Sequence, residues 1–201
     1  MNDEPNLQQF VDRLSSYSDE TSQAGGAVPL AGDKMPVIGT VQEIAGSGSA
    51  VSMDAALLHK LSTSSDLSVA MAGQVGSQVK MKVGNSWLIA NVRTMRAGAP
   101  GEVIANVDFL GEGQHSSGGR MTNFRRGVTR YPIPGSEIFP VNTEDMRAIF
   151  AASDEANIEI GTVYPTDDIR GALYVDPMLS KHFAVLGSTG TGKSTSVALI
   201  L

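Results

Sequence analysis

Residues 187–194, GSTGTGKS, hold three glycines, a lysine and a closing serine at the spacing G-x-x-x-x-G-K-S. Glycines let a backbone turn its N–H groups toward an anion at close range, because a Cβ at those positions would obstruct the approach. A lysine after the last glycine adds a point charge for the terminal phosphates, and the next hydroxyl can ligate a Mg²⁺ ion that bridges them. The spacing therefore predicts a loop that binds the phosphates of a nucleotide.

The residues on either side of this stretch fit the same interpretation. Residues 183–186, FAVL, are an apolar run typical of a buried strand, and residues 194–201 favour a helix that begins at the end of the loop. The positive end of that helix would add to the field at the phosphates. A Gly/Ser/Thr-rich linker that matches by chance is the alternative, and the predicted strand and helix favour the nucleotide site over it.

We therefore expect ATP and Mg²⁺ as cofactors. Lys193 is the predicted catalytic residue, because its charge would stabilise the terminal phosphates, and Ser194 is the predicted Mg²⁺ ligand. The residues predicted to bind the nucleotide phosphates are Gly187, Ser188, Thr189, Gly190, Thr191, Gly192, Lys193, Ser194 and Thr195.

The sequence ends at Leu201, inside the apolar turn 197–201, without a glycine, asparagine or proline stop signal. An apolar helix of this kind needs a sheet to bury it, and an ATPase of this class needs a further acidic segment that holds Mg²⁺ and positions water. We therefore expect this chain to be the front portion of a larger P-loop ATPase. On its own it should bind nucleotide poorly and hydrolyse none.

The composition narrows the class of protein. Of the 201 residues, 41% are hydrophobic, which suffices for a core, and the absence of cysteine excludes disulfide scaffolds and zinc–cysteine sites. A net charge of −6 argues against a surface that binds nucleic acid everywhere, but it leaves room for a local basic patch. The acidic N-terminus has no secretory signal pattern and no apolar run is long enough to cross a bilayer, so we expect a cytoplasmic protein without membrane contact.

Most of the chain shows the period of β-strands, which predicts a mainly β fold. Residues 36–141 contain closely spaced alternating segments with Gly-containing turns between them, as in a small antiparallel β-barrel or sandwich. Within this region, residues 54–61 are predicted to form a short helix capped by Asp54, and residues 111–119 a polar loop.

Three further segments complete the predicted organisation. Residues 1–34 form a lead segment, either one short amphipathic helix that docks on a partner or a frayed, disordered tail. Residues 142–181 link the barrel to the motor through a capped helix and two strands, and residues 182–201 are the start of an α/β P-loop ATPase domain. The linking elements are predicted at 142–152, 158–164 and 171–175.

The most basic stretch of the chain lies within residues 120–131, where four arginines alternate with two aromatic residues. Arginines that neutralise phosphates would give a salt-dependent contact with DNA. The same side chains would equally suit ion pairs between subunits or a solvated strand face, which is the more usual role of a charge run. The candidate contact residues are Arg120, Arg125, Arg126 and Arg130.

Three segments resemble the HerA-like ATPase family, whose members carry an N-terminal HAS barrel before a RecA-like motor. Residues 38–47, IGTVQEIAGS, resemble the first barrel hairpin of that family, and residues 124–135, FRRGVTRYPIPG, resemble its late barrel segment. Residues 160–190 resemble the junction into the P-loop. The similarity spans residues 36–201 and leaves residues 1–34 without a counterpart.

The resemblance implies an ATP-dependent DNA translocase or helicase that works as a hexameric ring on double-stranded DNA. It further implies a nuclease or effector protein that docks on the barrel, in DNA end processing or in phage defence. The acidic and arginine-finger residues of the family's motor have no counterpart in these 201 residues, so they cannot be assigned.

Two other functions stay open at this point. The chain would also suit an oligomerisation or adaptor module without activity of its own. It would further suit another barrel-plus-P-loop ATPase, such as a rotary-ATPase-type subunit or an RNA translocase. Residues 124–135 favour the HerA-like interpretation over the last of these.

Overall fold

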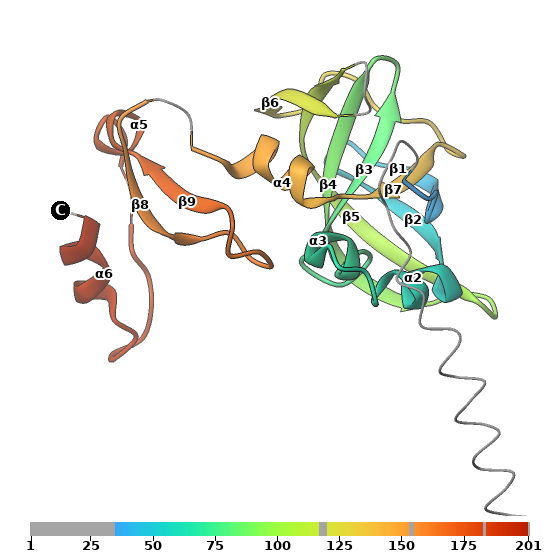
Figure 1. Ribbon diagram of the computed structural model, residues 1–201, viewed down its shortest axis with the longest axis horizontal. Helices are drawn as coiled ribbons and strands as arrows, with labels where there is room; N and C mark the ends of the chain where they lie inside the picture. Colours follow the sequence, from blue (N-terminus) through green and yellow to red (C-terminus); the bar gives the residue numbers. More distant parts are fainter. Residues whose placement is uncertain (1–34, 117–119, 153–154, 183, 201) are drawn as a thin grey trace, which may run out of the picture. The chain divides into compact units, whose positions relative to one another are not determined.

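The computed structural model describes residues 35–116, 120–152, 155–182 and 184–200 (Figure 1). The lead segment 1–34, with its predicted helix or tail, lies outside the described residues. Within the described ranges, no helix is long and apolar enough to cross a lipid bilayer.

A closed antiparallel barrel forms the larger part of the described chain (Figure 1). Its strands are β1 Gly39–Ile44, β2 Gly48–Asp54, β3 Gln78–Val83, β4 Ser86–Ala97, β5 Glu102–His115 and β7 Glu137–Pro140. They follow the order β2-β1-β7-β3-β4-β5, and a pairing between β2 and β5 closes the ring. A further strand, β6 (Met121–Arg126), pairs with β5. The mainly β fold with an antiparallel barrel that the sequence predicts is confirmed.

Strand β5 is longer than the sequence predicts. Its first half pairs with β2 and its second half pairs with β6. The polar loop predicted at 111–119 is therefore wrong for residues 111–115, which belong to the strand. Gly111 and Gly113 permit the close approach of β6 there: a Cβ on Gly111 would lie 2.2 Å from the carbonyl oxygen of Arg125.

The inside of the barrel is a continuous apolar core. Alternate residues of each strand point inward, as the pleat of a strand requires. Val79 and Met81 on β3, and Leu88 and Ala90 on β4, are at most 1% exposed. We call this cluster the inner core.

A predicted short helix packs against the inner core. Helix α2 covers Ala55–Leu61 and begins at Asp54, whose side chain accepts a hydrogen bond from the Leu57 N–H. The capped helix expected at 54–61 is therefore confirmed, and Leu61 contributes to the inner core.

The opposite face of β3 and β4 is buried as well. Lys80 on β3, and Trp87 and Ile89 on β4, are 3%, 6% and 0% exposed. Helix α4 (Thr143–Phe150) covers this face through Met146. We call this second cluster the outer core; its buried apolar members are Trp87, Ile89, Met121, Val141, Met146 and Ile169.

Helix α4 is held to the barrel by polar contacts at its first turn. Asn142 and Asp145 form a capping box, which confirms the capped helix predicted within residues 142–152. The Asp145 carboxylate also accepts a hydrogen bond of 2.5 Å from Lys80 Nζ, and this Nζ lies 4.8 Å from the centroid of the Trp87 ring. A buried charge pair thus joins β3 to α4.

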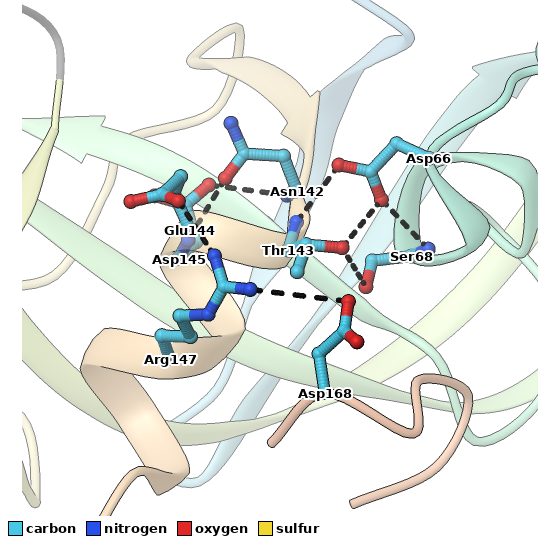
Figure 2. A network of polar contacts seen from close by, with 8 residues as sticks. All are labelled: Asp66, Ser68, Asn142, Thr143, Glu144, Asp145, Arg147 and Asp168. Atoms are coloured by element: carbon cyan, nitrogen blue, oxygen red, sulfur yellow. Dashed lines mark hydrogen bonds and ion pairs between the residues drawn. The ribbon is translucent and has the colours of Figure 1, made fainter.

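A second carboxylate joins α4 to the short helix α3 (Leu67–Ala70). The Asp66 side chain accepts hydrogen bonds from the Ser68 N–H of α3 and from both the N–H and the hydroxyl of Thr143, each at 2.9 Å (Figure 2). One side chain therefore satisfies donors in the first turns of two helices.

The remaining described residues form a hairpin and two helices. Strand β8 (Asn157–Thr162) pairs antiparallel with β9 (Arg170–Tyr174), and helices α5 (Val175–Leu179) and α6 (Lys193–Ile200) follow. The two strands and the final helix agree with the sequence prediction to within a few residues.

The strand predicted at 183–186 is not formed by its described residues. Residues 184–186 have no regular structure, and the Leu186 side chain is 90% exposed. A strand satisfies its backbone groups only through a neighbour, and no described strand pairs with this segment. The prediction was wrong because an apolar run indicates burial without supplying the partner strand.

Replacing Lys80 by Met should destabilise the barrel by about 3–5 kcal/mol, because the Asp145 carboxylate would stay buried without its counter-charge. The double variant Lys80→Met/Asp145→Asn should recover most of that loss, since it removes the charge and keeps an acceptor for the helix cap. Urea unfolding of both variants and of Asp145→Asn gives the coupling energy. A loss below about 1 kcal/mol in Lys80→Met would contradict a structural role for the pair.

Candidate phosphate-binding site

Residues 187–192 form an exposed turn that leads directly into helix α6. Gly190 and Gly192 adopt φ angles of +84° and +78°, in the left-handed region that side chains with a Cβ rarely adopt. Gly187 is required for a different reason, because a Cβ there would lie 2.6 Å from the Thr191 hydroxyl oxygen. The conformation of the loop therefore favours glycine at all three positions of the motif.

The loop closes on one carbonyl group. The Ser188 carbonyl accepts hydrogen bonds from the Thr191 hydroxyl at 2.8 Å and from the Thr191 N–H at 3.4 Å. The Lys193 ammonium group donates to the same oxygen. Lys193 is therefore held over the loop by a neutral backbone acceptor and not by a carboxylate.

The loop also ends at the positive pole of a helix. Lys193 begins α6, and the exposed residues Ser194 and Thr195 lie in its first turn. The first backbone N–H groups of a helix have no partner within it, and the helix dipole places partial positive charge at the same point. The sequence-predicted residues from Gly187 to Thr195 thus lie together in one loop and helix start, with N–H groups, an ammonium and two hydroxyls available to an anion.

The four candidate arginines do not share one environment. All four are exposed, and Arg125 forms an ion pair with Glu112, with 2.8 Å between Nη2 and Oε1. Within the part of the chain that the structure describes, no ion pair is formed by Arg120, Arg126 or Arg130. Arg125 is therefore committed to an internal contact, while the other three present free charge to solvent.

Glu112 is the residue that sequence reasoning missed in this region. It lies on β5, is 7% exposed, and accepts hydrogen bonds from the Thr129 N–H at 3.2 Å and from the Thr129 hydroxyl at 2.9 Å. The hydrogen bond from Arg125 is the main cause that lowers the pKa of Glu112, against the opposing effect of burial. In the sequence, Glu112 stands in a Gly-rich segment that is typical of an exposed loop, so nothing in the local pattern indicates that its carboxylate is buried.

A resident metal site is not apparent in the described ranges. No group of three or more His, Asp or Glu side chains lies close enough there to hold a metal ion. His115 packs against Trp87, with 5.4 Å between the ring centroids, so it is half-buried against the outer core.

Comparison with known proteins gives a consistent result. Residues 158–201, which include β8, β9 and the loop, match the family described as "Helicase HerA, central domain". The DNA double-strand break repair helicase HerA of Pyrococcus furiosus is 35% identical over 100 residues, which are 50% of this chain and 16% of that protein. The probable helicase MJ1565 of Methanocaldococcus jannaschii is 31% identical over 70 residues, which are 35% of this chain and 13% of that protein.

These matches support the similarity to HerA-like proteins that the three resembling segments predict. The β-barrel precedes the matched segment in the chain, as the resemblance implies. The matched part spans less than a fifth of the length of either relative.

Removing the Arg125 side chain should lower stability at neutral pH by about 1–2 kcal/mol, since a charged hydrogen bond with an exposed donor is lost. The pKa of Glu112 is lower in the folded state than in the unfolded state. Its contribution to the free energy of unfolding is therefore complete above the usual glutamate pKa of about 4.3, and it is lost as the pH falls through the lowered pKa of the folded state. Arg125→Ala should therefore flatten the fall in stability below that pH. Urea unfolding between neutral and acidic pH measures this, with Arg126→Ala as the control; equal pH profiles for the two variants would contradict it.

Proposed function

We propose that the protein containing this chain is an ATP-dependent DNA translocase or helicase of the HerA type. In this proposal residues 36–141 are the HAS barrel, residues 142–181 link it to the motor, and residues 182–201 begin the RecA-like ATPase domain. The observation that carries the proposal is the glycine loop at the start of α6, which lies inside the segment matched by the HerA central-domain family. The names of both relatives, each a helicase, support the same conclusion.

The loop's own chemistry fits a nucleotide phosphate. Two glycines with positive φ let the backbone curve, and a helix N-terminus adds unpaired N–H donors. Among the described residues, the Lys193 ammonium donates to the Ser188 carbonyl, and it can exchange that neutral acceptor for a phosphate oxygen at little cost. Ser194 would hold the Mg²⁺ that accompanies ATP. The bound nucleotide supplies the hydrolysable phosphoanhydride; the residues of this chain bind and orient it.

We further propose a homo-hexamer acting on double-stranded DNA in the cytoplasm, with a nuclease or effector protein docked on the barrel. This rests on the family, in which DNA repair is named for the Pyrococcus relative. Three exposed arginines form no ion pair within the described ranges and are the proposed contacts to DNA or to a neighbouring subunit: Arg120, Arg126 and Arg130.

An adaptor function without catalysis is the second candidate, and one observation favours it. The barrel has its own inner and outer cores, and neither includes a residue of the loop 187–195. A barrel of this kind would recruit a partner whether or not nucleotide is bound.

Lys193→Ala in the full-length protein should reduce ATP hydrolysis by about 100-fold or more, the usual loss when a charge that stabilises the transition state is removed. Its melting temperature should stay unchanged, because the hydrogen bond that Lys193 makes within the described part of the chain is to an exposed carbonyl. Lys181→Ala is the matched control, since Lys181 is an exposed lysine of the same segment outside the loop. Full ATPase activity in Lys193→Ala would refute the site, and partner recruitment without any ATPase in the parent protein would favour the adaptor function.

If Arg126 and Arg130 contact duplex DNA, replacing each by Ala should weaken binding and reduce the salt dependence of log K by about 0.9 per arginine. Fluorescence anisotropy with a labelled duplex at several salt concentrations measures both effects. Arg93→Ala is the control, because Arg93 is exposed and already pairs with Asp108 at 3.6 Å. If the slope of log K against log salt concentration is unchanged in the Arg126 and Arg130 variants, these arginines do not contact DNA.

A further inference from the structure

The turn that joins β8 to β9 is compact and has its own internal hydrogen bonds. Within residues 163–169, which we call the hairpin tip, the Val163 N–H donates to the Ile169 carbonyl at 2.8 Å. The Thr166 N–H donates to the Val163 carbonyl at 3.0 Å. The hairpin tip is therefore a defined structural unit and not an open loop.

Burial in the hairpin is concentrated at this tip. Ile169 is 2% exposed and Thr166 is 4% exposed, whereas Ile160 on β8 is 47% exposed. Ile169 is a member of the outer core together with Trp87 and Met146, and Val163 packs against the same cluster. The tip thus completes the apolar cover that α4 begins over the outer face of the barrel.

Polar contacts around the tip are few and weak. Arg147 of α4 donates to Glu144 at 2.7 Å and lies 3.9 Å from the Asp168 carboxylate, as Figure 2 shows. The Thr166 hydroxyl is buried without a hydrogen-bond partner in the described part of the chain. Since an exposed ion pair adds little and an unpaired hydroxyl costs free energy, apolar packing around Ile169 holds the tip in place.

The tip lies on the path from the barrel to the phosphate-binding loop. Strand β9 leads from the tip into α5, and the chain then reaches Gly187 within eight residues of Leu179. The segment matched by the HerA central-domain family begins at residue 158 and so includes the tip. The family match therefore includes both the loop and a segment that packs into the outer core, on the outside of the barrel.

We propose that the hairpin tip is the anchor that couples the phosphate-binding segment to the barrel, with Ile169 as its main positioning residue. The tip makes no contact with substrate; it limits how far the loop segment can move away from the barrel. Events at the nucleotide are then transmitted to the barrel and to whatever the barrel holds. This inference rests on the proposed function, because transmission requires that the loop bind nucleotide.

The test uses the full-length protein and a series at one position: Ile169→Val, Ile169→Ala and Ile169→Asp. Hydrogen exchange of the tip amides reports docking directly and needs no nucleotide. ATP hydrolysis with and without duplex DNA ends reports coupling. Ile160→Asp is the matched control, because it places the same charge on an exposed isoleucine of the same hairpin.

Tip exchange should accelerate from Val to Ala to Asp, and DNA stimulation of hydrolysis should fall in the same order, by about tenfold in Ile169→Asp. The KM for ATP should change less than about twofold, since the loop itself is intact. The Ile160 variant should behave as the parent in both assays. If Ile169→Asp does not fold, the Val and Ala variants still give the order.

Two results would overturn the anchor. Faster tip exchange with unchanged DNA stimulation would show that docking has no part in coupling, and unchanged exchange would show that Ile169 does not hold the tip. Failure of the proposed function is separate: it would appear as a parent protein without ATPase activity, while tip exchange still responded to the Ile169 series.

Discussion

The structure depends on the burial of both faces of one part of the barrel. A small barrel buries its interior and can leave its outer surface in contact with water. The outer face of β3 and β4, however, carries Trp87, Ile89 and a lysine that is only 3% exposed. The buried lysine, Lys80, requires a counter-charge, and Asp145 supplies it from the first turn of α4. Together with the Asp66–Thr143 hydrogen bonds, this contact holds the first turn of α4 on the barrel, and the hairpin tip packs in the same cluster as α4.

The two cores have different consequences for function. The inner core fills the closed ring and contains no residue of the hairpin β8–β9 or of the loop 187–195. The outer core includes Ile169, a residue from the segment that leads to the phosphate-binding loop. Within the described residues, the tip is therefore joined to the barrel mainly by apolar packing, and the exposed pair Arg147–Asp168 in Figure 2 adds little to the strength of this contact.

The sequence predicts the features that follow from a local residue pattern. It does not predict those that depend on contacts between distant parts of the chain. Strand alternation predicts the barrel, Asp54 predicts one helix start, and the acidic segment 142–152 predicts a second capped helix. The glycine spacing predicts the turn before α6. The buried Lys80 looks like any outward residue of a strand, because only α4, more than sixty positions away, removes it from water. Gly111 and Gly113 indicate a turn by composition, yet they serve the close approach of β6. The strand predicted at 183–186 failed for the same reason, since pairing requires a neighbour.

The central claim is that the loop from Gly187 to Thr195 holds a nucleoside triphosphate, and a direct view of the bound state tests it best. A crystal structure of the full-length protein with Mg²⁺ and a non-hydrolysable ATP analogue should place the phosphates against the backbone N–H groups of this loop. Lys193 should then have left the Ser188 carbonyl for a phosphate oxygen. A nucleotide bound elsewhere, or a Lys193 that still donates to Ser188 beside an occupied site, would contradict the account.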